Sequence, residues 1–407
     1  MTRRLYQQDA YRTGFDAVVS AVMDVNGRPG VVLEGTYFYP ESGGQPCDTG
    51  TLGGVAVEAV VEEGGDVIHL LAARPEFGPG DRVEGVIDWR RRFMNMQQHT
   101  GQHILSQAFE RVLGAPTVSS ALGTGHSTID VARLGLTWED MARVEALAND
   151  MVYEDRAVEI CEVSPEEAGD IRTKKTGRPG VERRLVRIVE VYDFDRSPCG
   201  GTHTRRSGEV GHIKIIRWEK VRDATRVEFL CGLLAGEDYF WKNRFVVDLA
   251  QKMTTRDTNL PGLIDDLVIE GKSLRREISG LKADLAMCRL GDLRAAAEKV
   301  GNISVIAATF DDLGLPELRQ VALKAVEGGS TVALFCLKGE KAQFVFSRSD
   351  GVPVDMREPM NAACEVVGGR GGGKPEVAQG GGDGADLAEE AIARALITVR
   401  SLLADMG

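Results

Sequence analysis

The sequence predicts an α+β multidomain protein, and three features of the chain lead to that prediction. Its 407 residues are too many for one typical core, so two or three domains are expected. Segments rich in β-branched residues and broken by Gly, Pro and Asn fill the first 89 residues, whereas helical periodicity becomes common afterwards. Strands and helices then follow one another without strict alternation, which favours antiparallel sheets over a doubly wound fold.

The first domain, residues 1–89, is predicted to be a small β-barrel that carries a glycine motif. Strand patterns occur at 15–22, 30–34 and 55–60. Between them lies the segment TYFYPESGGQP, residues 36–46. Its glycine pair is typical of a simple turn, and equally of a loop whose backbone amides approach a ligand. The pattern alone leaves both interpretations open.

Two short motifs mark the second domain, residues 90–235, which is predicted to be an α+β domain with an antiparallel sheet. The first motif is HTGQH at 99–103, inside a helix expected over 94–112, so its histidines share one helix face. The second is CGGTH at 199–203, where two glycines permit a tight turn in a connection between strands. Imidazole and thiolate ligands suit Zn²⁺, so the sequence predicts one zinc site. Its ligands are His99, His103, Cys199 and His203.

Charge gives a weaker indication about the partner. A net charge of −12 argues against an indiscriminate nucleic-acid binder. Any single basic cluster is typical of a solvated surface, but three of the four lie near the zinc motifs in sequence, which favours a polyanionic substrate. The clusters are Arg90 to Arg92, Lys174 and Lys175 with Arg178, Arg183 and Arg184 with Arg187, and Arg205 with Arg206.

The remainder is predicted to form a helical linker, 236–300, and a C-terminal α/β domain, 301–407. Apolar residues of the linker follow a heptad pattern that fits either a helical hairpin or a coiled-coil dimer, and Pro261 favours a break between two helices. The C-terminal domain contains a glycine-rich loop that fits a simple flexible connection, but the cationic side chains inside it favour a backbone cradle for phosphate. The RNA-binding candidates in that loop are Arg370, Gly371, Gly372 and Lys374.

The composition predicts a cytoplasmic protein without a membrane partner. No apolar segment approaches the roughly 18 residues that span a bilayer, and the first residues lack a signal-peptide core. Seven scattered cysteines fit reduced thiols better than a disulfide framework.

With these motifs in place, the chain resembles the editing domain of alanyl-tRNA synthetase and its freestanding relatives, the alanyl-tRNA editing proteins. HTGQH, CGGTH and TYFYPESGGQP carry the resemblance, which covers essentially the whole chain and matches the long freestanding form. The first 90 residues leave no room for a class II catalytic core. The resemblance therefore implies an enzyme of protein biosynthesis that proofreads in trans and does not charge tRNA with ATP.

The resemblance also implies a substrate and roles for individual residues. It makes the four motif residues zinc ligands, places Thr36 at the serine hydroxyl of the substrate, and puts Gln45 and Gln102 at the site as catalytic candidates. The family's usual glycine triplet is Ser42-Gly43-Gly44 here, which leaves Ser versus Gly specificity open. The implied activity is zinc-dependent hydrolysis of the aminoacyl ester on alanine tRNA mischarged with Ser or Gly.

Three points stay open at this level. Catalytic zinc usually keeps a free position beside three protein ligands, whereas this motif pair supplies four. Either one ligand is loose, or the ion expands its coordination shell, or zinc mainly positions substrate; we favour positioning with partial polarisation of the carbonyl. The main alternative to an editing enzyme is a noncatalytic RNA-binding protein with structural zinc. A third possible function is hydrolysis of small nucleotides by the C-terminal domain. A homodimer through the linker or the C-terminal domain is a further expectation.

Overall fold

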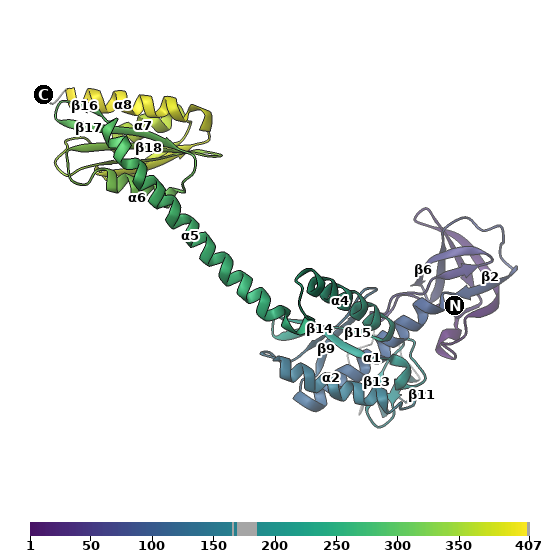
Figure 1. Ribbon diagram of the computed structural model, residues 1–407. Helices are drawn as coiled ribbons and strands as arrows, with labels where there is room; N and C mark the ends of the chain where they lie inside the picture. The colour runs from purple at the N-terminus through teal and green to yellow at the C-terminus, as the bar shows by residue number, and fades with distance from the viewer. Residues whose placement is uncertain (165–166, 169–184, 405–407) are drawn as a thin grey trace. The chain divides into compact units, whose positions relative to one another are not determined.

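The computed structural model describes residues 1–164, 167–168 and 185–404, and it confirms a multidomain α+β protein with antiparallel sheets (Figure 1). The chain divides into two compact units, Met1–Leu249 and Ala250–Gly407. Within the described ranges, no helix is both long and apolar enough to cross a membrane. The basic residues Lys174, Lys175, Arg178, Arg183 and Arg184 lie outside these ranges.

The first unit begins with a closed barrel whose strands follow the order β2-β3-β7-β6-β5-β8. Alternate residues point inward, as in β8, where exposed and buried positions alternate along the strand. The interior is filled by apolar side chains such as Phe15, Leu33 and Val60. Closure leaves no free strand edge in the barrel. Its strands are β2 (Gly14–Val25), β3 (Arg28–Leu33), β5 (Gly50–Leu52), β6 (Val55–Glu63), β7 (Asp66–Leu71) and β8 (Arg82–Ile87), with β1 (Arg3–Arg4) pairing β4 (Gly35–Thr36) outside it.

A long helix, α1 (Trp89–Leu113), leads from the barrel into the second half of this unit. Two antiparallel sheets pack there with α1 and α2 (Trp138–Tyr153), and α2 begins at a capping box formed by Thr137 and Asp140. Apolar residues of both helices and both sheets share one core. The sheets are β14-β15-β10-β9 and β11-β12-β13, formed by β9 (Thr117–Leu122), β10 (Ser127–Val131), β11 (Val158–Val163), β12 (Val186–Val191), β13 (Asp195–Pro198), β14 (Ile213–Val221) and β15 (Ala224–Cys231).

The predicted helical stretch consists of two helices, α4 (Gly232–Lys252) and α5 (Leu260–Ala295). The break falls before Pro261, as predicted, because proline lacks the amide that an interior helical position donates and fits the first turn of a new helix. Packing of these helices as a hairpin stays a prediction. The α5 end of the stretch contributes Ala286 and Leu290 to a core of the second unit.

The second unit contains a six-stranded sheet in the order β16-β17-β18-β19-β21-β20. Its central strand β18 is buried on both faces: Val332, Leu334 and Cys336 face one core, and Ala333 and Phe335 face the other. Its elements are β16 (Glu298–Val300), β17 (Ile303–Phe310), α6 (Leu315–Ala325), β18 (Thr331–Lys338), β19 (Ala342–Arg348), α7 (Arg357–Val366), β20 (Arg370–Gly373), β21 (Val377–Gly382) and α8 (Ala388–Ala404).

The glycine-rich segment corrects one prediction, because it is a pair of strands instead of a loop. β20 and β21 form an antiparallel hairpin in which Gly371 lies opposite Gly380. A Cβ on Gly371 would lie 2.5 Å from Cγ of Met360, and one on Gly380 would lie 2.5 Å from Sγ of Cys364. The glycines therefore let α7 lie directly against the hairpin, and their lack of side chains is the reason that no strand pattern is visible in the sequence.

Candidate metal centre

The candidate metal centre is built on α1, whose residues from Asn95 to Ser106 are all buried. The helix starts at Asp88, whose side chain accepts a hydrogen bond from the amide of Arg91, and ends at Gly114 in the left-handed conformation. Gly101 lies in the middle, and a Cβ there would lie 2.2 Å from Sγ of Cys231. This glycine of the HTGQH motif thus lets the end of β15 pack on the helix.

The structure brings the four predicted ligands together. His99 and His103 come from α1, and Cys199 and His203 come from the turn after β13. One ligand atom from each residue lies within 4.8 Å of the others. Sγ of Cys199 is 3.2 Å from Nε2 of His99 and 3.2 Å from Nε2 of His203. Borderline nitrogen and soft sulfur donors in one cluster fit a zinc ion, with Nε2 as the ligating atom of the histidines.

Each histidine of the cluster has a different outer partner on its second ring nitrogen. Nδ1 of His103 lies 2.9 Å from the carboxylate of Asp195, and Nδ1 of His203 lies 3.2 Å from Oγ1 of Thr100. Nδ1 of His99 lies 2.7 Å from Oε1 of Gln45. Such partners fix the tautomer and orientation of metal-binding imidazoles.

The protonation of the cluster follows from burial and from its close neighbours. Burial opposes the thiolate, but the imidazoles of His99 and His203 hold the pKa of Cys199 well below its usual value. Burial also opposes an imidazolium at His103, yet the bond to Asp195 raises its pKa to about 10. A thiolate beside one imidazole that holds its proton, that of His103, is a site where metal binding and proton release are coupled.

The three catalytic candidates lie in different surroundings. Gln45 contacts the cluster through His99, whereas Nε2 of Gln102 donates to Oγ of Ser106, 2.8 Å away. Thr36 is fully buried at the start of the barrel loop, and its Oγ1 accepts from the amide of Phe38 at 3.1 Å. The structure thus places one of the three at the cluster by a direct hydrogen bond, and their catalytic roles stay predictions.

The hydroxyl of Thr36 contacts His69, a residue that no sequence motif singled out. Nδ1 of His69 lies 2.9 Å from the carbonyl of Val31, and its Nε2 lies 2.8 Å from Oγ1 of Thr36. Burial lowers the pKa of His69 to about 4, so the ring is neutral near pH 7. Because a carbonyl can only accept, Nδ1 carries the proton and Nε2 accepts from the Thr36 hydroxyl.

One basic cluster was misinterpreted at Arg92. Its side chain is fully buried and forms an ion pair with Asp48, which is equally buried, and it donates to the carbonyls of Ala10 and Tyr37 at 2.6 Å. It therefore stabilises the loop after β4 against α1 and cannot contact phosphate. Arg90, by contrast, is exposed and paired with Glu237 at the surface.

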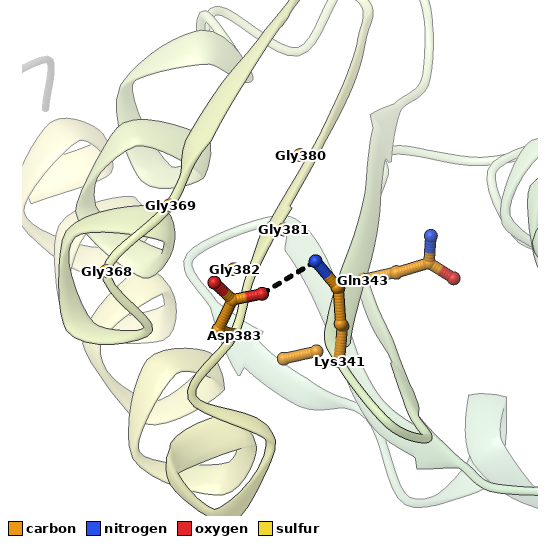
Figure 2. A pocket seen from close by; sticks show the side chains of 9 residues that line it. Lys341, Gln343, Gly368, Gly369, Gly380, Gly381, Gly382 and Asp383 are labelled. Carbon is orange, nitrogen blue, oxygen red and sulfur yellow. Dashed lines mark ion pairs between the residues drawn. The ribbon is translucent and has the colours of Figure 1, made fainter. Parts of the chain in front are cut away.

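In the second unit, the predicted RNA-binding residues Arg370 and Lys374 are exposed on the β20–β21 hairpin and at its turn. A cavity of about 340 Å³ lies beside the hairpin, and neither of them lines it. Figure 2 shows that cavity, which is lined in part by the backbone of Gly380 and neighbouring glycines. At the same cavity, Lys341 forms an ion pair with Asp383 at 2.7 Å.

Three family models match parts of the chain. The "Threonyl and Alanyl tRNA synthetase second additional domain" matches residues 186–227, which include the CGGTH motif. The model "tRNA synthetases class II (A)" matches 13–91, the stretch that holds the strands β2 to β8, and the DHHA1 domain matches 302–405.

Curated relatives extend the match to nearly all of the chain. Alanyl-tRNA editing protein AlaX-L of Pyrococcus horikoshii is 32% identical over 391 residues, which cover 93% of this chain and 94% of that protein. The chain belongs to the family of alanyl-tRNA editing proteins. Alanine–tRNA ligase of Pyrococcus furiosus is 34% identical over 400 residues, 96% of this chain, but the chain spans only 43% of that ligase. The C-Ala domain of Aquifex aeolicus alanyl-tRNA synthetase, a crystal structure, is 28% identical with a TM-score of 0.24 and covers 26% of this chain and 96% of that one.

Sequence reasoning selected Gln45 but missed the other two outer partners of the candidate metal cluster, Asp195 and Thr100. Asp195 and Thr100 carried no spacing signal of their own, although Thr100 lies inside the HTGQH motif. Asp48 and Arg92 are far apart in sequence, and only the packing of the loop on α1 pairs them. Asp195 could have been selected by its position, because it lies a few residues before CGGTH and metal-binding histidines commonly donate a hydrogen bond to a carboxylate.

Proposed function

We propose that this chain is a trans-editing hydrolase that deacylates alanine tRNA mischarged with serine, with Gly-tRNA as a second substrate. The observation that carries the proposal is the cluster of three imidazoles and one thiolate within 4.8 Å, in a chain that belongs to the alanyl-tRNA editing family. The bond to be broken is the ester between the amino acid and the terminal ribose.

The donor set and its surroundings fit zinc. His99, His103, Cys199 and His203 would hold the ion, and the outer partners leave each Nε2 available for it. When bound, zinc would orient the terminal nucleotide and polarise the ester carbonyl in part. The protein residues would supply the remaining work, which is to select the amino acid and to hold the ester beside the cluster.

Selection against alanine needs a polar contact, because fit by one methyl or hydroxyl group separates substrates by only about 10- to 200-fold. Thr36 supports such a contact. Its hydroxyl donates to His69 and accepts from the amide of Phe38, so one lone pair remains for a further donor. A seryl hydroxyl would supply that donor and an alanyl methyl would not.

The second unit would bind the tRNA through cations on its surface. Exposed Arg370 and Lys374 on the hairpin are cations suited to phosphate, with Gly371 and Gly372 allowing close backbone approach. On α5, exposed apolar residues support the homodimer predicted from the heptad pattern, since exposed apolar seams of this kind pair in coiled coils. They are Ile264, Leu267, Leu274, Ile278, Leu281 and Leu285.

The test is a deacylation panel with Ser-, Gly- and Ala-charged alanine tRNA. The full chain should release serine, release glycine at a rate that reports on Ser42, and leave Ala-tRNA intact. Cys199→Ala should reduce release far more than tRNA binding. Release of alanine at the serine rate would contradict the selection argument.

A noncatalytic RNA-binding protein with structural zinc is the second candidate. The closed set of four ligands favours it, because structural zinc sites are closed whereas catalytic sites keep an open position. That function predicts tRNA binding with no turnover of any charged tRNA. The same panel therefore separates the two candidates.

A further inference from the structure

The outer partner of His99 comes from a different part of the fold than those of the other two histidines. His103 and His203 contact Asp195 of β13 and Thr100 of α1, which lie next to the cluster in sequence. Gln45 belongs to the loop that leads from β4, which pairs with β1 outside the barrel, to the barrel strand β5. The metal centre is therefore completed by the barrel.

The orientation of the Gln45 amide is fixed by its neighbours. The side chain is fully buried, and its Oε1 accepts from the amide of Thr202 at 3.1 Å while its Nε2 donates to Oγ1 of Thr202 at 2.8 Å. A backbone amide can only donate, so Oε1 must face it. The same oxygen lies 2.7 Å from Nδ1 of His99, which must therefore carry the ring proton. Nε2 of His99 is left with its lone pair toward the cluster.

Space for this bond depends on the second glycine of the CGGTH motif. A Cβ on Gly201 would lie 2.2 Å from Cε1 of His99, 2.4 Å from its Nδ1 and 2.8 Å from Oε1 of Gln45. At Gly200, by contrast, a Cβ would meet nothing within 4 Å. Of the two glycines, Gly201 is the one that the contact between His99 and Gln45 requires.

The loop that carries Gln45 is held in one conformation. Ser42 and Gln45 pair across a tight turn, with backbone hydrogen bonds of 3.0 and 3.3 Å, and both Gly43 and Gly44 have positive φ, +59° and +84°. Further along the loop, Asp48 pairs with Arg92 of α1. Arg91 of the same helix also donates to the carbonyl of Cys47 at 2.9 Å, so the loop is attached to the ligand-bearing helix at several points.

We propose that Gln45 is a positioning residue for the metal and that Gly201 makes room for it. Gln45 fixes the tautomer and ring orientation of His99 and so couples the conformation of the barrel loop to metal occupancy. The coupling is reciprocal: an ordered loop strengthens metal binding, and bound metal orders the loop. The inference rests on the proposed metal site, but its test does not require deacylation.

The experiment measures Zn²⁺ affinity of the full chain by competition with a chromophoric chelator, together with the visible spectrum of the Co²⁺ form. Gln45→Leu removes both polar atoms and should weaken Zn²⁺ binding about 10- to 100-fold, the usual cost of losing an outer partner. Gly201→Ala should do the same by displacing His99, with a changed Co²⁺ spectrum. The matched control Gly200→Ala should leave both readouts as in the parent chain.

Gln45→Glu provides the rescue. Its carboxylate can still accept from His99 and from the amide of Thr202, and the Thr202 hydroxyl can rotate to donate. Affinity should return to near the parent value, and this variant also decides the matter if Gln45→Leu does not fold. Unchanged Zn²⁺ affinity in Gln45→Leu, equal losses in both glycine variants, or a loss in Gln45→Glu as large as in Gln45→Leu would overturn the proposal. Failure of the proposed function would appear separately, as no deacylation by a parent chain that binds Zn²⁺ normally.

Discussion

The two units of the molecule bury very different side chains. In Met1–Leu249 the interior holds a connected set of polar groups, among them Arg92 with Asp48 and the outer partners of the metal cluster. In the described part of the second unit, residues 250–404, the buried polar side chains are those of Ser347 and Ser349. The core of the second unit is otherwise apolar, with helices against both faces of its sheet.

Under the proposed function, this difference assigns the reaction to the first unit and tRNA binding to the second. Buried polar groups cost free energy unless each is paired, so a protein retains them where they orient reacting or metal-binding groups. The second unit uses glycines to bring α7 against the β20–β21 hairpin and keeps its cations at the surface. Substitutions in the first unit should therefore change metal binding and reactivity, and those in the second should change packing or tRNA affinity only.

The largest effect is expected from the metal ligands. Cys199→Ser replaces the thiolate by a poorer ligand, and Zn²⁺ affinity should fall by more than the about 100-fold cost of losing an outer partner. Release of serine from mischarged tRNA should fall with it. Metal content and deacylation rate check this prediction. As an internal control, the unfolding transition of the second unit, followed by calorimetry of the full chain, should not move. A full complement of tightly held zinc in this variant would contradict the assignment.

The buried ion pair should give the largest loss of folding stability. Arg92→Met leaves Asp48 charged and without its partner at zero exposure, which should cost about 3–5 kcal/mol. Unfolding in urea, followed by tryptophan fluorescence, measures it, because all four tryptophans lie in the first unit.

Arg90→Met is the matched control for that change. Its ion pair with Glu237 is exposed, so the loss should stay below about 1 kcal/mol. Equal losses in the two variants would show that the ion pair of Arg92 is no more important than one at the surface.

His69 should make the first unit sensitive to acid. Its pKa is about 4 in the folded chain, against 6.5 for an exposed histidine, so the unfolded chain binds the proton first as the pH falls. The contribution of neutral His69 to the free energy of unfolding is fully present above pH 6.5. It is lost as the pH falls toward 4, by about 3 kcal/mol in total. Urea midpoints across this range should fall less steeply in His69→Gln. Parallel pH profiles for the variant and the parent chain would contradict the prediction.

The smallest expected effect tests the glycine hairpin of the second unit. Gly371→Ala places a Cβ against Met360 and should cost about 1–3 kcal/mol through overpacking. Gly372→Ala, where a Cβ meets nothing within 4 Å, should stay within about 0.5 kcal/mol. Calorimetry of the second unit distinguishes the two, and metal affinity should be unchanged in both. A loss of metal from Gly371→Ala would contradict the conclusion that packing in the second unit does not affect metal binding in the first.

Much of the fold could be predicted from the pattern of apolar residues. The helix that bears HTGQH and the helix capped by Thr137 have a helical period that the sequence displays, and β18 appears as a continuous apolar run, as expected of a strand buried on both faces. The glycine-rich strands β20 and β21 could not be recognised, because glycine has no side chain through which a strand pattern is expressed. The charge pattern was misleading at Arg92, since a basic residue looks the same whether it is solvated or paired inside the protein.

By itself, the sequence determined which residues can bind the metal, because HxxxH on a helix and a CGGTH turn fix ligand type and local spacing. Only the tertiary structure decided what surrounds them: Gln45 from the barrel on His99, Asp195 on His103, and the burial that lowers the pKa of His69. The reason is physical. Ligand identity is a property of single side chains, whereas tautomer, desolvation and hydrogen bonding depend on groups that approach only when distant segments pack together.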